Sequence, residues 1–126
     1  MKRSDVDNFE KLNAQLDSLH QEMSMLAKKS PNDAVNAFKI RLVNTTLELC
    51  NELFGAKYKP FAEFVTFQTD ELPSNSDVTF IVSQYIECAE KFRADNILME
   101  HGLWYWQLDG MKEKIRTSPP KKLINK

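Results

Sequence analysis

Residues 31–54 read PNDAVNAFKIRLVNTTLELCNELF, and this stretch decides the fold. Ser30 and Pro31 are residue types that begin helices, as the N-cap and at the first helical position. Gly55 is the type that ends them. Apolar side chains fall on the helix in two stripes, of which the first is Val35, Phe38, Leu42, Leu49 and Leu53 and the second is Ile40, Val43, Leu47, Cys50 and Phe54. Because two stripes cover most of a helix's circumference, we expect this helix at the centre of a bundle.

The preceding segment, residues 4–29, predicts a helix with a narrower apolar face. Ser4 is a suitable N-cap, and two lysines at the other end place positive charge in the last turn. The apolar side chains recur at alternating intervals of three and four residues, and they are Phe9, Leu12, Leu16, Leu19, Met23 and Leu26. This spacing is the heptad seam of a coiled coil, which packs either on the chain's own bundle or on a second copy. Because the seam is narrower than bundle helices need, we favour the second copy and expect these six residues to bind a partner. Replacing Leu16 with glutamate is then expected to give a folded monomer.

The segment after Gly55 predicts two further helices. Phe61, Phe64 and Phe67 recur every three residues after a proline, which indicates a short Phe-rich helix that plugs the open end of the bundle. Residues 76–96 then carry apolar side chains at helical spacing, with charged residues on the opposite face. The predicted fold class is therefore all-α, with an antiparallel three-helix core.

A change of period near the C-terminus predicts a β-hairpin. Trp104 and Trp106 alternate with polar residues, and Asp109-Gly110 separates them from a second alternating run. Asp-Gly favours a two-residue hairpin turn, which places Trp104 opposite Ile115. Both tryptophans then share one face, opposite the face of Tyr105, Lys112 and Lys114, and we expect the tryptophans to be structural.

Length and composition indicate one domain with a distinct tail. The chain has 126 residues, of which 42% are hydrophobic and 28% are charged, and its net charge is −1. We predict a single helical domain with the terminal hairpin at 1–117, followed by a flexible basic tail at 118–126. Cys50 and Cys88 fall on apolar helix faces and are expected as reduced, buried residues. With neither a secretory leader nor an apolar run of ~18 residues, the expected location is cytoplasmic, with no membrane partner.

Four glutamates offer an alternative function, a magnesium site. Glu48 and Glu52 lie one turn apart on the helix predicted at residues 31–54. Glu87 and Glu90 lie on the helix predicted at residues 76–96. Carboxylates at helical spacing on two helices resemble the site of MazG-type nucleotide pyrophosphohydrolases, which implies magnesium-dependent hydrolysis of a nucleotide. The second pair falls on the polar side of its helix, however, and the doubled glutamate of that family is missing.

A lesser alternative is binding of single-stranded nucleic acid by the hairpin and the basic tail, since aromatic side chains beside lysines can stack on bases. The predicted faces of the hairpin separate the tryptophans from the lysines, which makes nucleic acid an unfavoured partner. We therefore expect a non-catalytic protein-interaction or regulatory module without a cofactor. In this interpretation the module self-associates as a dimer through the heptad seam.

Overall fold

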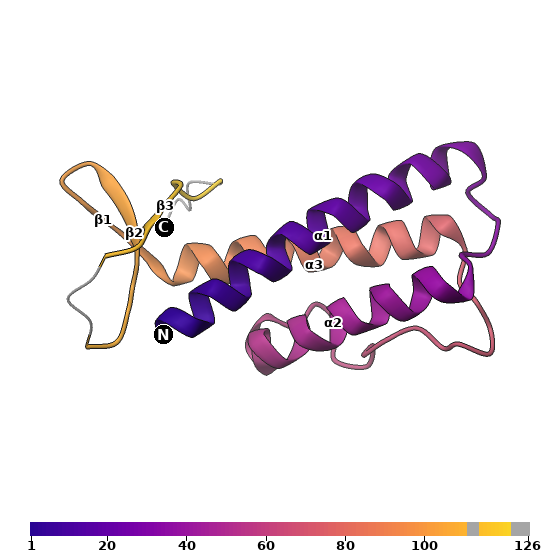
Figure 1. Cartoon of the computed structure of the whole chain (residues 1–126), viewed down its shortest axis with the longest axis horizontal. Coiled ribbons are helices and arrows are strands. Elements are labelled where there is room, and N and C mark those ends of the chain that lie inside the picture. The colour runs from indigo at the N-terminus through magenta and orange to yellow at the C-terminus, as the bar shows by residue number, and fades with distance from the viewer. Residues whose placement is uncertain (111–113, 122–126) are drawn as a thin grey trace.

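A computed structural model describes residues 1–110 and 114–121 of the chain (Figure 1). The described elements, in chain order, are α1 (Arg3–Lys29), α2 (Ala37–Tyr58), α3 (Asn75–Asp95), β1 (Ile97–Glu100), β2 (Leu103–Trp106) and β3 (Arg116–Thr117). The strands form one small antiparallel sheet in the order β1-β2-β3. The prediction of a mainly α-helical fold that ends in a hairpin is confirmed.

The main helix pair is α1 with α3, which lie side by side over most of their length (Figure 1). The third helix, α2, packs against one side of this pair. Its C-terminal end lies beside the C-terminal end of α3, where the rings of Phe54 and Phe92 are 5.7 Å apart. The helices α2 and α3 are therefore parallel, and α1 is antiparallel to both. The prediction that residues 31–54 form the central helix is wrong, because α1 and α3 form the main pair and one apolar face of α2 is exposed.

The start of α2 also differs from the prediction. The helix begins at Ala37 rather than Pro31, and its N-cap is Asn36, whose side chain accepts a hydrogen bond from the Lys39 amide at 2.8 Å. The backbone before it is used elsewhere, since the Val35 amide donates to the Pro73 carbonyl at 2.9 Å. Bonds of this kind to the segment before α3 replace the helical bonds that residues 31–36 would otherwise make.

The regular geometry of α2 breaks where Gly55 adopts a φ of 65°, as its sequence position predicts, and one further turn follows to Tyr58. The predicted Phe-rich helix is absent: residues 59–74 form an irregular segment along α2. Asn44 of α2 explains this conformation, because its side-chain amide bonds both the N–H and the C=O of Phe67 at 2.9 Å. Asn51 similarly donates to the Val65 carbonyl at 3.0 Å. Backbone groups that a helix would pair internally are thus paired with α2.

The sheet has a hairpin turn that the sequence analysis missed. The chain reverses at His101-Gly102, where φ is 52° and 80°, so that β1 pairs with β2. The pairing of β2 with β3 places Trp104 opposite Thr117 and not opposite Ile115 as predicted. The shift is two residues, an even number, so the paired residues of β2 and β3 keep their predicted faces. Residues 111–113, which include Lys112, lie outside the described part of the chain.

Candidate interaction surface

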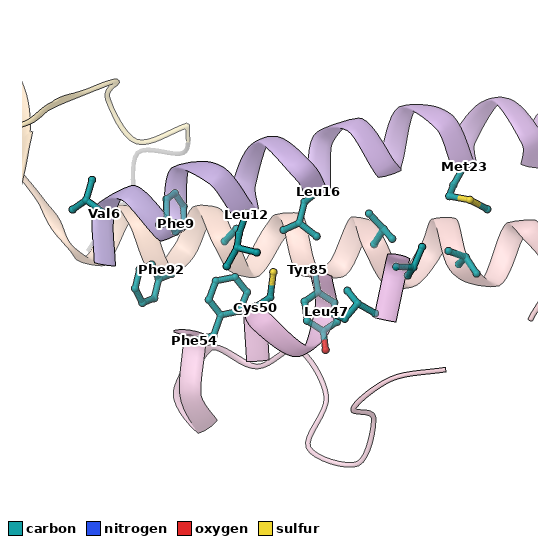
Figure 2. Close-up of a cluster of buried hydrophobic side chains, with 14 of the residues drawn as sticks. Val6, Phe9, Leu12, Leu16, Met23, Leu47, Cys50, Phe54, Tyr85 and Phe92 are labelled. Atoms are coloured by element: carbon teal, nitrogen blue, oxygen red, sulfur yellow. The ribbon is translucent and has the colours of Figure 1, made fainter. Parts of the chain in front are cut away.

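The six residues of the predicted heptad seam pack against the hydrophobic core of their own chain. Phe9, Leu12, Leu16 and Met23 are buried, and Leu19 and Leu26 are partly buried against the same core. Figure 2 shows Leu12 and Leu16 pointing from α1 towards Cys50 and Tyr85. Contact of this seam with a partner stays a prediction, and it would require the helices to separate first.

The face of α2 that the sequence analysis expected to be buried is instead on the surface. Phe38, Leu42 and Leu49 of the first stripe are 62%, 50% and 46% exposed, and Leu53 is partly buried. The second stripe fills the core, so α2 has one apolar face for its own chain and another that faces outward. Single exposed apolar side chains are ordinary, but several at helical spacing on one face mark an interaction site. We call these four residues the outer stripe.

The outer stripe borders a groove between α1 and α2 with a volume of about 1200 Å³. Leu12 and Thr46, both buried, lie at its floor. The α2 wall is mainly apolar: Leu42, Leu49 and Leu53 line it, together with Thr45 and Glu52. The α1 wall is mainly polar: besides Ala14 and Leu19, it carries Asp5, Asn8, Lys11, Gln15 and Ser18. A mainly apolar wall opposite a mainly polar one suits an amphipathic helix better than a small apolar ligand.

Two opposite charges, one in each half of α2, lie beside the outer stripe. Arg41 lies in the N-terminal half and Glu48 in the C-terminal half, both exposed and seven residues apart. A spacing of seven places them on the same edge of the helix, two turns apart. Lys39 lies on the other edge, where it forms a 2.8 Å ion pair with Glu22 of α1. The outer stripe is thus flanked by α1 on one edge and by two opposite charges on the other.

The four glutamates of the magnesium alternative are not brought together. Glu48 and Glu52 are exposed on α2, and Glu87 is exposed on α3. The Glu90 carboxylate is bound by the Arg93 guanidinium at 2.9 and 3.0 Å. Across residues 1–110 and 114–121, no three His, Cys, Asp or Glu side chains gather in a way that could hold a metal ion. These carboxylates therefore do not fit the predicted magnesium site.

The aromatic hairpin residues are mostly used in packing. Trp106 is buried, and its ring meets the ring of Phe9 edge-on at 5.1 Å, whereas Trp104 is partly buried against the core. Lys114 is exposed, pairs with Glu100, and lies over the ring of Tyr105 at 5.4 Å. The prediction that Trp106 closes one end of the core is confirmed. Its ring is not available for stacking on bases.

Arg93 is a structural residue that the sequence analysis did not identify. It is buried, and besides Glu90 it donates to the backbone carbonyls of Ser118 at 2.6 Å and Pro119 at 3.0 Å. The Lys121 amide donates to Glu90 at 2.9 Å. This network fixes the first part of the predicted flexible tail to α3. The one sequence signal was the Glu–Arg spacing of three on the third helix, which is common on helix surfaces.

Neither cysteine has the properties of a nucleophile. Both thiols are unpaired, and burial raises the pKa of Cys50 from an ordinary value of 9.0 to about 12. Partial burial also raises the pKa of Cys88. Since the unfolded chain loses the Cys50 proton near pH 9 and the folded chain near pH 12, this thiol favours the folded state fully below pH 9. That contribution to the free energy of unfolding is lost as the pH rises from 9 to 12.

We expect Cys50 to resist a thiol-specific colorimetric reagent at pH 8 while the chain is folded, because it is buried and protonated. Cys88, which is partly exposed, should react first, and both should react at once in denaturant. A Cys88→Ser variant isolates the Cys50 signal. Rapid labelling of that variant under native conditions would contradict the described burial.

Among the described residues, no helix is long and apolar enough to cross a lipid bilayer. Comparison with family models, curated proteins and solved structures finds no match to this chain.

Proposed function

We propose that this chain is a non-catalytic protein-interaction module and that its contact surface is the groove between α1 and α2 together with the outer stripe. The observation that carries the proposal is the exposure of Phe38, Leu42 and Leu49 on one face of a helix whose opposite face is buried. A helix with both faces apolar is typical of one that is covered on both sides. The proposal moves the contact from the heptad seam of α1 to α2.

The free energy gained by burying the exposed side chains of the outer stripe supports such a contact. Burying a whole Leu or Phe side chain contributes about 1.5–3 kcal/mol, so covering the exposed half of one contributes roughly half of that. The three most exposed residues of the outer stripe lie in a row, so a single partner helix can cover all of them. The polar wall of α1 supplies amide, hydroxyl and amine groups that can orient this helix.

A cytoplasmic location is part of the proposal. Two cysteines without a disulfide, Cys50 and Cys88, support a reducing compartment. Catalysis is not part of it, because the predicted carboxylates are dispersed and the thiols are protonated. Within residues 1–110 and 114–121, the exposed apolar face of α2 supports protein interaction among the three functions considered from the sequence.

Leu49→Glu tests this function, since a charge at the centre of an apolar contact weakens binding by several kcal/mol. Proteins captured from native cells by the tagged wild type, further copies of the chain included, should be lost with Leu49→Glu. Met99→Glu is the matched control, because Met99 is 59% exposed on β1, outside the groove. Its captured proteins should equal those of the wild type. Identical capture by all three proteins would overturn the proposed function.

A further inference from the structure

We propose that the partner at the outer stripe is a second copy of this chain, bound with its α2 antiparallel to the first about a twofold axis. This inference rests on the proposed interaction function and names its partner. It assigns the dimer contact to α2, and the pattern of apolar and charged residues along α2 carries it.

The exposed residues of α2 have heptad spacing. Phe38, Leu42, Thr45 and Leu49 follow one another at intervals of four, three and four residues, and all four are exposed. These are the intervals between successive core positions of a coiled coil. In an antiparallel pair Phe38 of one copy meets Leu49 of the other, and Leu42 meets Thr45. Because the contact is isologous, each such pair occurs twice.

The charges distinguish antiparallel from parallel pairing. Arg41 and Glu48 occupy the same position in successive heptads, next to the outer stripe on the edge away from α1. Antiparallel pairing places Arg41 of each copy opposite Glu48 of the other, which gives two complementary pairs. Parallel pairing places this edge of the two copies on opposite sides of the contact, so Arg41 and Glu48 gain no partner from each other. Charge complementarity of this kind fixes the register and orientation of paired helices.

The position of α1 is compatible with the same axis. Thr46 and Leu53 line the groove, so α1 flanks the edge of α2 opposite to Arg41 and Glu48. A twofold axis perpendicular to the helices then places the two α1 helices side by side, with their polar walls facing each other. The volume of the groove is roughly that of an α-helical segment of about ten residues with its side chains. Helices of the second copy can therefore fill it.

Reciprocal charge reversal tests this arrangement. At about 100 µM, where a dimer with a Kd of ~10 µM predominates, the wild type should sediment at twice the monomer mass. Arg41→Glu alone and Glu48→Arg alone should each weaken self-association about tenfold, because each replaces two attractive pairs with two repulsive ones. An equimolar mixture of the two variants should form a heterodimer of near wild-type affinity, since every pair is then complementary. Native mass spectrometry with one mass-tagged variant identifies that heterodimer.

Asp17→Arg is the control for charge, because Asp17 is exposed on α1 and does not line the groove. Its self-association should equal that of the wild type, and far-UV circular dichroism should show that all variants are folded. A wild type that is monomeric at this concentration, or a mixture that fails to associate, would overturn the inference. If the wild type is monomeric and Leu49→Glu still abolishes capture of another protein, the second copy is excluded as the partner and the interaction function stands.

Discussion

Replacing Leu16 with glutamate is expected to unfold most of the chain. Leu16 is fully buried, at 0% exposure, at the meeting point of the three helices (Figure 2). The substitution removes a large apolar side chain and places an unpaired carboxylate in its position, which together cost more than about 4 kcal/mol. Since a domain of this size has a stability of about 5–15 kcal/mol, little remains. The midpoint of urea unfolding, followed by circular dichroism at 222 nm, measures the loss.

This expectation replaces the one drawn from the sequence, that the same variant is a folded monomer, because Leu16 is buried within the chain. Gln21→Glu is the matched control, because it adds the same charge to an exposed position of α1 and should change stability by no more than about 0.5 kcal/mol. A Leu16→Glu protein that keeps the wild-type unfolding midpoint would contradict the burial of the heptad seam. It would return that seam to the surface as a contact site.

Trp106→Ala is expected to destabilise the chain by roughly 3–5 kcal/mol, as truncations of large core residues do. Trp106 is 3% exposed and packs edge-on against Phe9 where β2 meets the end of the helix pair. Its indole N–H is buried, and none of the described residues accepts a hydrogen bond from it. Trp106→Phe should therefore cost clearly less, because it keeps most of the packing and removes an unsatisfied donor.

Thermal and urea unfolding of both variants, with Trp104→Ala beside them, separate a structural from a binding role. Trp104 is only partly buried, so its truncation should cost less than that of Trp106. An unchanged melting temperature for Trp106→Ala would refute the structural role. Loss of affinity for single-stranded nucleic acid in the same variant would then favour the nucleic-acid alternative.

The parts of the fold that local chemistry determines could be predicted from the sequence. The first helix was predicted at residues 4–29 and is observed at Arg3–Lys29, because its apolar spacing and terminal lysines act within the segment. Gly55 adopts the left-handed φ that its position predicts. The second stripe of α2 is buried as expected, and the alternation of residues 104–106 places Trp106 in the core.

The parts that depend on competing long-range contacts could not be predicted. Both stripes of α2 are equally apolar, and only the pairing of α1 with α3 decides which of them faces outward. The predicted start at Pro31 failed because the backbone around Val35 pairs with Pro73, a contact between residues far apart in sequence. The Phe-rich segment failed in the same way, through Asn44 and Asn51.

The position of the candidate contact surface could not be predicted from the sequence. A heptad seam and self-association were expected on α1, where the seam proved to be the core of the monomer. The heptad pattern of Phe38, Leu42 and Leu49 was present in the sequence, but two apolar stripes on one helix also describe a fully buried helix. Exposure, which only the fold reveals, distinguishes the two interpretations.

Site-specific photo-crosslinking tests the central claim most directly. A photoreactive amino acid in place of Leu49, irradiated in cells that produce the protein, should yield a covalent adduct of discrete mass, because the account predicts that another protein covers this face. The same amino acid at Asp17 should yield no such adduct. A chain that remains uncrosslinked from position 49 while folded would contradict the claim that the outer stripe is a contact surface.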